Sequence, residues 1–306
     1  MLNIVKRRYL YFAISLIVIV PGLIAYLLWG LPLAIDFTGG SLLEVQFNSS
    51  TAPDPTAVIE LYTAQGFEAP RVQSSNDGVM IIRSKFLDND ARTQLLNAMQ
   101  EQFGDITVLR FDSVGPTVGK EVTTRATGAV AFAAIFIMLY ITWAFRGVPH
   151  ALRYGVSAIL AMLHDVAVVV GLSAIFGKFL GWEIDSLFLT ALLTVIGFSV
   201  HDSIVVFDRI RENSTIYRRL PYETLVNHSI VQTLDRSINT QLTVMFTLLA
   251  LALFGGETTR HFVVTLLVGV SSGTYSSIFN AAPILVVWEN KEWRNWFNPV
   301  REANAS

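Results

Sequence analysis

Six long apolar segments constrain this chain more than any other feature of its sequence. Each reaches, or nearly reaches, the roughly 20 residues that a helix needs to cross a bilayer. Charged residues make up only 15% of the chain, compared with roughly 25% in soluble domains. We therefore predict an α-helical polytopic membrane protein with six transmembrane helices near Tyr9–Trp29, Gly128–Phe145, Ala151–Phe176, Ser186–Phe207, Ile238–Phe254 and Phe262–Trp288.

Basic residues near the ends of these segments predict the orientation. Lys6–Arg8 precede the first segment, and an arginine-rich loop, 208–237, separates the fourth from the fifth. The opposite short loops hold only Lys178 and Arg260, so the positive-inside rule places both termini in the cytosol. The loop is expected to lie on the inner surface as an interfacial helix. The first segment is too long for a signal peptide and lacks an A-x-A cleavage site, which indicates an uncleaved anchor.

The segment 30–125 follows the first helix and is therefore expected outside the cytosol. Its patterns follow the order β-α-β-β-α-β, with turn residues at Asn76–Gly78, and this order indicates a ferredoxin-like α+β domain. The segment contains no histidine and only scattered acids, so we expect a binding or structural module. The other predicted divisions are the N-terminus with helix 1 (1–29), helices 2–6 (126–290) and a cytosolic tail (291–306).

Two of the predicted membrane helices carry a histidine followed by an aspartate: His164 with Asp165, and His201 with Asp202. A charge at the bilayer centre costs about 2.5–3.5 kcal/mol on insertion scales, so such residues face the bundle interior and serve pairing or transport. Asp165 is expected near mid-bilayer and Asp202 in the cytosolic third. Ser199 shares a helix face with Asp202, whereas His201 points about a quarter-turn away. A metal site built from the four residues is disfavoured, because adjacent side chains diverge on a helix.

Polar residues form a stripe along the start of the fifth segment. If this helix neighbours the fourth, the Arg236 guanidinium can reach the Asp202 carboxylate. Pairing favours the charged carboxylate and burial favours the neutral acid, so the group could load and release a proton; a static buried ion pair is the alternative. The stripe comprises Arg236, Asn239, Thr240, Thr243 and Thr247. In the sixth segment we expect close backbone packing, and no chemistry, at Gly269, Gly273, Ser276, Ser277 and Asn280.

Several long motifs resemble the SecD/SecF family of protein-export membrane proteins. The stretch "TVIGFSVHDSIVVFDRIREN" is similar to the fourth transmembrane helix of SecF-like members. Further similar stretches are "IDFTGGSLLEVQF", "SVGPTVGKE", "LHDV" and "QTLDRSINTQLT", so the resemblance extends over nearly the whole chain. One departure is His201, where many relatives are expected to have asparagine. This histidine either joins proton handling or fills the space of an amide.

The resemblance implies a subunit that pairs with SecD, a homologous six-helix protein, in a twelve-helix assembly of the RND superfamily type. The complex would work with the SecYEG translocon, and with YajC as a further partner, in the bacterial inner membrane. It would use the proton-motive force to help pull preproteins across on the extracytoplasmic side. The protein would contact protons, preprotein and membrane lipids. No enzymatic activity, cofactor or metal is expected, and the net charge of −2 argues against a nucleic-acid partner.

The motif matches also imply roles for individual residues. Asp202 would carry the proton, Arg236 would be its partner, and Asp165 is a weaker match. Together with nearby polar residues on the same helices, the predicted proton-coupling set is Asp202, Arg236, Asp165, His201, Ser199 and Asn239.

Three other functions are compatible with parts of the sequence. An intramembrane aspartyl protease would use Asp165 and Asp202, but such enzymes need a G-x-G-D context that "GFSVHD" lacks. An RND-like small-solute transporter would have to work as a homodimer, because the chain supplies only one six-helix half. A passive membrane assembly factor would carry Asp202 only as a structural residue.

Overall fold

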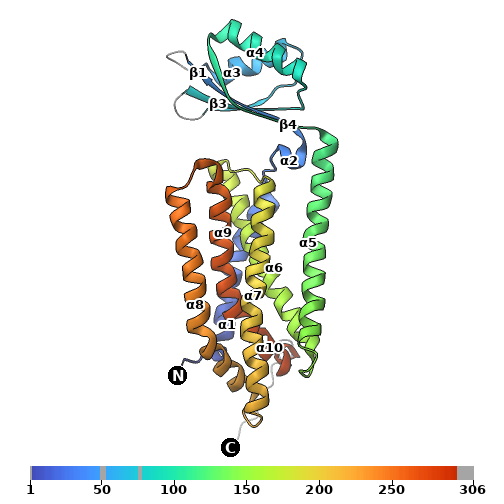
Figure 1. The fold of residues 1–306 in the computed structure, drawn as a ribbon, viewed down its shortest axis with the longest axis vertical. Coiled ribbons are helices and arrows are strands. Elements are labelled where there is room, and N and C mark those ends of the chain that lie inside the picture. Colours follow the sequence, from blue (N-terminus) through green and yellow to red (C-terminus); the bar gives the residue numbers. More distant parts are fainter. Residues whose placement is uncertain (1, 49–52, 75–77, 295–306) are drawn as a thin grey trace, which may run out of the picture. The chain divides into compact units, whose positions relative to one another are not determined.

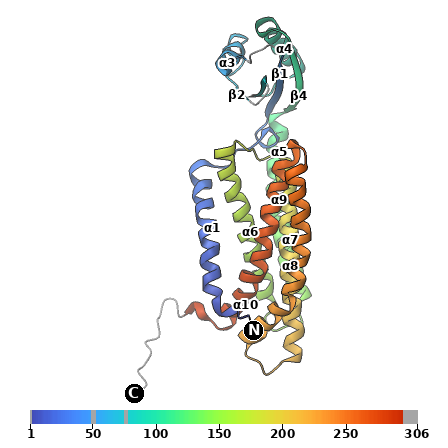
Figure 2. The same cartoon turned by 90° about the vertical axis from the view of Figure 1, so that its left-hand side faces the viewer.

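The chain forms two compact units, shown in Figures 1 and 2. The computed structural model describes residues 2–48, 53–74 and 78–294, so most of the predicted tail and the predicted turn residues Asn76 and Asp77 lie outside the described residues. Met1–Pro32 and Ala129–Ser306 form the membrane unit, and Leu33–Gly128 form the small α+β unit. Within the described residues, six helices are long and apolar enough to cross a membrane, which confirms the predicted architecture.

The small unit separates α1 from α5, and from α5 onward the helices follow one another with short connections. Their bounds are α1 (Arg8–Trp29), α5 (Pro116–Ala144), α6 (Ala151–Leu180), α7 (Ser186–Ile216), α8 (Tyr222–Phe254), α9 (Glu257–Ser276) and α10 (Ala282–Glu289). The residues Ser277–Ala281 form a π-helical turn between α9 and α10, so the last span, Thr259–Glu289, consists of three parts. At the start of α7, the Asp185 side chain accepts a hydrogen bond from the Phe188 amide at 2.9 Å and caps the helix.

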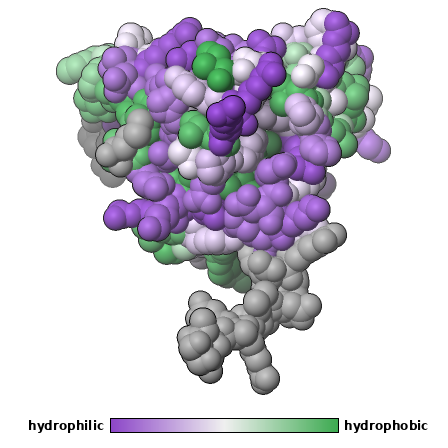
Figure 3. All heavy atoms as spheres, turned by 90° about the horizontal axis from the view of Figure 1, so that it is seen from below, coloured by the Kyte–Doolittle hydropathy of each residue, from purple (hydrophilic) through white to green (hydrophobic). Residues whose placement is uncertain are grey.

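The arginine-rich segment 208–237 was predicted as a cytosolic loop that holds an interfacial helix, and the structure shows it to be mostly helical, with a short turn between two long helices. α7 continues to Ile216 and α8 begins at Tyr222, so the two long helices take up most of the segment. Asn213 Nδ2 donates to Ser229 Oγ and to Gln232 Oε1, each at 2.8 Å. Because these polar side chains satisfy one another between the helices, a segment of loop-like composition packs as a helical hairpin. Figure 3 shows this end of the membrane unit covered largely by hydrophilic residues.

The membrane unit is built around α6, which packs against α1, α7 and α9. Against α1 the approach is backbone to backbone, because a Cβ added to Gly171 would lie 2.6 Å from the Cα of Gly22. Glycine pairs of this kind allow membrane helices to pack closely. On the other side, Met162 and Ile196 are fully buried in the core. The same packing brings polar residues of α6, α7, α8 and α9 into the interior.

The small unit contains the predicted ferredoxin-like arrangement. Its elements are β1 (Gly40–Phe47), α3 (Pro55–Ala64), β2 (Arg71–Ser74), β3 (Val79–Ser84), α4 (Asn89–Phe103) and β4 (Ile106–Val114). The strand order is β2-β3-β1-β4, and every neighbouring pair is antiparallel, as in a split βαβ fold. Alternate strand residues such as Val45 and Ile82 are buried in one core with Tyr62 of α3 and Leu95 of α4.

Two consecutive glycines join the short helix α2 (Ile35–Thr38) to β1. Gly39 has φ of 71° and Gly40 has φ of 134°, values that residues with a Cβ rarely adopt. A Cβ on Gly39 would lie 2.8 Å from the Cα of Pro116, and one on Gly119 would lie 2.6 Å from the Gly39 nitrogen. Glycine is therefore required here both for the backbone conformation and for the close approach of the first turns of α5.

Candidate functional site

The first of the two membrane aspartates is held between α6 and α9. The Asp165 residue is only 1% exposed. Its Oδ1 atom accepts a hydrogen bond from Ser272 Oγ at 2.7 Å, and Oδ2 accepts one from Ser276 Oγ at 2.6 Å. His164 Nδ1 lies 2.9 Å from Oδ1. Buried carboxylates are costly unless hydrogen-bonded, and here both oxygens have donors.

Glycine in α9 makes this arrangement possible. A Cβ on Gly273 would lie 3.3 Å from the Cα of Ser199 in α7 and 3.6 Å from Asp165 Oδ2. α9 therefore lies against α7 and against the Asp165 carboxylate at the same level. The small residues of the sixth segment do pack closely, but the expectation that they carry no chemistry was incomplete. Ser276 and its neighbour Ser272 are the donors to the carboxylate.

The second aspartate, Asp202, lies on α7 and is 3% exposed. Gln241 of α8 donates from Nε2 to its Oδ2 atom. His201 Nδ1 lies 3.6 Å from Oδ1, which is too long for a hydrogen bond. Asp202 therefore has one donor from a neighbouring helix, whereas Asp165 has three hydrogen-bonding neighbours.

Buried polar atoms without partners accompany Asp202. Among the described residues, Ser199 Oγ, Ser237 Oγ and Gln241 Oε1 are buried and make no hydrogen bond. Ser199 precedes Asp202 by one helical turn, and Ser237 precedes Gln241 by one turn. Unsatisfied buried polar groups are uncommon in native structures and call for an explanation, such as a catalytic role or a bound water or ion. These three atoms at the α7–α8 contact can therefore form further hydrogen bonds.

The predicted pairing of Asp202 with Arg236 is not present in this chain. Within the described residues Arg236 forms no ion pair with Asp202, and both Arg236 and Asn239 are exposed on the outer side of α8. The His201 side chain is 66% exposed. Of the six predicted coupling residues, the structure buries Asp202, Asp165 and Ser199 and leaves the other three on the surface.

A different face of α8 meets α7. Thr233, Ser237 and Gln241 are buried and follow one another at intervals of four residues. This stripe lies next to the Arg236 stripe on the helix surface, turned by about 100° for Ser237. The sequence prediction named the Arg236 stripe and not Gln241. The four-residue spacing of Thr233, Ser237 and Gln241 also indicates a polar helix face and could have identified Gln241.

Two features of the described residues bear on the metal and protease alternatives. No group of three or more histidine, aspartate or glutamate side chains among them is placed to hold a metal ion. The two aspartates have separate hydrogen-bond partners and share no hydrogen bond with each other. Aspartyl proteases instead use two carboxyl groups that share one proton. The arrangement thus favours separate roles for Asp165 and Asp202.

Comparison with known families and proteins gives a consistent result. Residues 94–291 match the family model described as "Protein export membrane protein SecD/SecF, C-terminal", and residues 30–51 match the "SecD/SecF GG Motif", which includes Gly39 and Gly40. The chain is 61% identical over 299 residues to the protein translocase subunit SecF of Anaerolinea thermophila, covering 97% of each chain. It is 48% identical over 316 residues to the SecF subunit of Thermobaculum terrenum, covering 100% of each.

Solved structures with the same fold come from SecDF proteins. The crystal structure of SecDF from Thermus thermophilus, titled a translocon-associated membrane protein, is 33% identical with a TM-score of 0.80. The match covers 94% of this chain and 39% of the SecDF chain. SecDF in a super-membrane-facing form matches with 31% identity and a TM-score of 0.67, over 98% of this chain and 40% of that one. The chain therefore spans about two fifths of these longer SecDF chains.

Proposed function

The chain belongs to the SecD/SecF family of protein-export membrane proteins and is, like its SecF relatives, a translocase subunit; from this premise we propose that it couples the proton-motive force to preprotein movement. The movement takes place on the extracytoplasmic side of the bacterial inner membrane, with both termini in the cytosol. The observation that carries the proposal is the buried Asp202 carboxyl group, which sits on a membrane helix with a single donor and unpartnered polar atoms beside it.

Asp202 is a better candidate for the proton carrier than Asp165. The Asp165 carboxyl group is held by Ser272, Ser276 and His164, so both of its oxygens already have hydrogen-bonding neighbours. Asp202 has only Gln241, whose amide offers a donor and an unpartnered acceptor. The charged Asp202 accepts from the amide NH₂, and the protonated acid can donate to the amide oxygen once the amide turns over. Each protonation state therefore has its own α7–α8 hydrogen bond.

The available energy is sufficient to bias a movement. One elementary charge that crosses about 100 mV gains about 2.3 kcal/mol. A shift of a two-state equilibrium from 1:99 to 99:1 takes about 5.5 kcal/mol. One or two protons per cycle thus supply a substantial part of such a shift. Protonation of Asp202 would replace one hydrogen bond to Gln241 with the other. The resulting movement of α7 against α8 would be transmitted to the small unit.

The exposed polar stripe of α8 is the proposed contact with a SecD-type subunit. Arg236, Asn239 and Thr240 lie on the surface of this chain, and an arginine is costly to expose to lipid. Relatives that carry both portions in one SecDF chain support association with SecD. In that complex the Arg236 and His201 side chains would be enclosed near Asp202. SecYEG, YajC and preprotein are the further proposed partners, and no catalytic reaction is assigned to the subunit.

The test is proton-dependent stimulation of export. Membrane vesicles that contain the complete translocation machinery are assayed for preprotein translocation with and without a proton gradient. Asp202→Asn should abolish the stimulation while the subunit still inserts and copurifies with its partner. Asp208→Asn is the matched control, because Asp208 lies on the same helix with an exposed side chain paired to Arg211. Full stimulation in the Asp202→Asn vesicles would overturn the proposal.

A further inference from the structure

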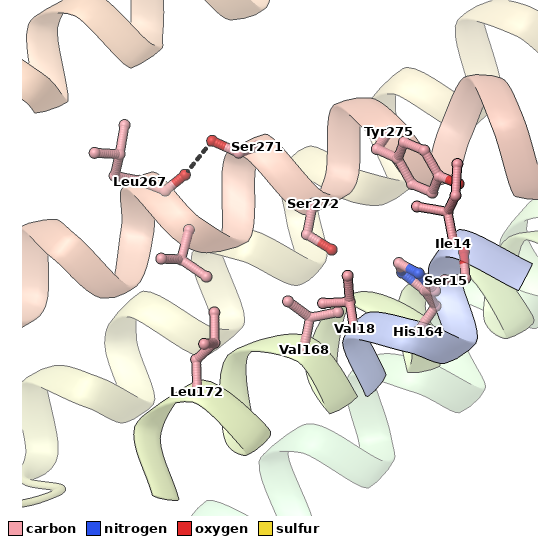
Figure 4. A pocket seen from close by; sticks show the side chains of 11 residues that line it. Ile14, Ser15, Val18, His164, Val168, Leu172, Leu267, Ser271, Ser272 and Tyr275 are labelled. Atoms are coloured by element: carbon pink, nitrogen blue, oxygen red, sulfur yellow. Dashed lines mark hydrogen bonds between the residues drawn. The ribbon is translucent and has the colours of Figure 1, made fainter. Parts of the chain in front are cut away.

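Serine hydroxyl groups on the membrane helices commonly donate to a backbone carbonyl one turn earlier in the same helix. Figure 4 shows one such bond, from Ser271 to the Leu267 carbonyl at 2.6 Å. Among the described residues of the membrane unit, three buried serine hydroxyls have no partner: Ser157, Ser199 and Ser237. Ser157 lies on α6. The other two belong to α7 and α8, the helix pair that holds the proposed proton carrier.

The hydroxyl groups of α7 and α8 lie on opposite sides of Asp202 along the bundle. The hydrogen bond from Gln241 places Asp202 and Gln241 at the same level. Ser199 precedes Asp202 by three residues, or about 4.5 Å, toward the start of α7. Ser237 precedes Gln241 by four residues, or about 6 Å, toward the turn between α7 and α8. In the proposed orientation, Ser199 is therefore on the extracytoplasmic side of the carboxyl group and Ser237 is on the cytosolic side.

Both hydroxyl groups are enclosed by protein. Ser199 is 1% exposed and Ser237 is 4% exposed. α9 covers Ser199 closely, because a Cβ on Gly273 would lie 3.4 Å from the Ser199 Cβ. A buried hydroxyl group without a hydrogen bond destabilises the folded protein. This cost is offset if each hydroxyl gains a hydrogen-bond partner at some stage of a transport cycle.

A serine hydroxyl can take part in proton transfer because it donates one hydrogen bond while it accepts another. Side chains one helical turn apart are about 5–6 Å apart at Cβ. A water molecule between two groups at this separation makes two hydrogen bonds of ordinary length. Each hydroxyl is thus within reach of the Asp202 carboxyl group through one water.

We propose that Ser199 positions the water that delivers a proton to Asp202, and that Ser237 positions the water that receives it. This assignment of two positioning residues rests on the proposed coupling function. On loading, a proton passes from water to a carboxylate oxygen of Asp202. On release, the proton of the carboxyl O–H group passes to water on the other side. No other covalent bond changes.

Other ionisable groups surround the carboxyl group, and the pH response must be separated from theirs. α9 and the π-helical turn carry no acid, base or histidine between 262 and 281. The ionisable side chains near this level on α7, α6 and α8 are His201, His164, Asp165, Asp235 and Arg236. All of them are retained in the serine variants below. A shifted pH profile therefore reports the hydroxyl group that was removed.

The test varies the proton concentration on each side of the membrane separately. Inverted membrane vesicles with the complete translocation machinery expose the cytosolic face to the medium and enclose the extracytoplasmic face. The membrane potential is collapsed with potassium and valinomycin. Stimulation of preprotein translocation is then measured over a series of lumenal pH values at fixed medium pH, and over a series of medium pH values at fixed lumenal pH.

Each variant should shift only one of these two profiles. Ser199→Ala should need a roughly three- to tenfold higher lumenal proton concentration for the same stimulation. Ser237→Ala should need a roughly three- to tenfold lower proton concentration in the medium. Ser203→Ala is the matched control, because the buried Ser203 hydroxyl already donates to the Ser199 carbonyl at 3.1 Å. Both of its profiles should match those of the unaltered subunit at equal subunit amounts.

Asp202→Asn in the same vesicles separates this inference from the coupling function on which it rests. If Asp202→Asn retains the stimulation, coupling through Asp202 is wrong and the roles of both serines are wrong with it. If Asp202→Asn loses the stimulation while both serine variants behave like Ser203→Ala, only the roles of the serines are overturned. A shift on the same side in both variants, or an equal loss at every pH, overturns these roles as well.

Discussion

Removal of the Ser276 hydroxyl tests whether the α6–α9 contact depends on the hydrogen bonds of Asp165. In the described structure Ser276 is the only donor to Oδ2, whereas Oδ1 is served by Ser272 and His164. A hydrogen bond to a charged group contributes about 1.5–3 kcal/mol in soluble proteins. Between membrane helices the measured contributions average about 0.6 and reach about 1.7 kcal/mol, because the unfolded helices also find partners in the bilayer. We therefore expect Ser276→Ala to cost about 1–2 kcal/mol, and Ser272→Ala to cost less.

The assay is reversible unfolding of the purified protein in bicelles, followed by tryptophan fluorescence. Ser271→Ala is the matched control, since the Ser271 hydroxyl donates to the Leu267 carbonyl of its own helix at 2.6 Å. Its effect should stay within about 0.5 kcal/mol. Ser276→Ala combined with Asp165→Asn should cost less than the two single changes added together, because both remove the same bond. A Ser276→Ala variant as stable as Ser271→Ala, or less damaging than Ser272→Ala, would refute this account of the contact.

Two further predictions concern helix packing and the ion pair of Arg8 with Glu292. Gly171→Val adds a side chain whose Cβ would lie 2.6 Å from the Cα of Gly22, so it should cost about 1–3 kcal/mol in the same unfolding assay. Gly197→Ala is the control, because an added Cβ there has nothing within 4 Å, and equal effects would count against the close contact. Burial favours a raised pKa for Glu292, but hydrogen bonds from Arg8, Tyr9 and Asn290 hold the pKa of Glu292 below its ordinary value of 4.5. Its contribution to stability is therefore complete above about pH 4.5 and is lost as the pH falls through the lowered pKa. Glu292→Gln should flatten the acid side of a stability–pH curve, and a curve of unchanged shape would contradict this.

The apolar patterns were sufficient to predict the architecture because apolar side chains avoid water, either in the hydrocarbon of a bilayer or in a protein core. Six segments were long enough to span a bilayer, and alternation in residues 30–125 gave the strand and helix order that the small unit adopts. The polar segment 208–237 was predicted as a loop with one interfacial helix, and the structure instead extends both flanking helices through most of it. Asn213, Ser229 and Gln232 satisfy one another across the α7–α8 hairpin, so their polarity reports pairing between helices and not exposure to water.

The details of the site depend on which helix faces meet, and a single sequence does not contain that information. α8 carries two neighbouring polar stripes, one through Arg236 and one through Ser237 and Gln241. Either could have faced Asp202, and the structure places Gln241 there. In the same way, the small residues around Gly273 predicted close packing but not its partner. Only the contact between α6 and α9 shows that Ser276 donates to Asp165.

The two membrane aspartates lie on adjacent helices but differ in how many hydrogen-bond donors surround them. This difference distinguishes a structural role for Asp165 from a proton-coupling role for Asp202. Asp165 has donors on both oxygens, so Asp165→Asn should lower the unfolding free energy by about 1–3 kcal/mol and leave the ratio of export with and without a proton gradient unchanged. Asp202 has one donor and unpartnered neighbours, so Asp202→Asn should affect stability little, since an amide can exchange hydrogen bonds with Gln241, and should remove the gradient dependence. Both variants are measured in the same vesicles, with unfolding followed in parallel. If Asp165→Asn removes the gradient dependence at unchanged stability, the proton is carried by the well-satisfied carboxylate, and a count of hydrogen-bond donors does not identify the carrier.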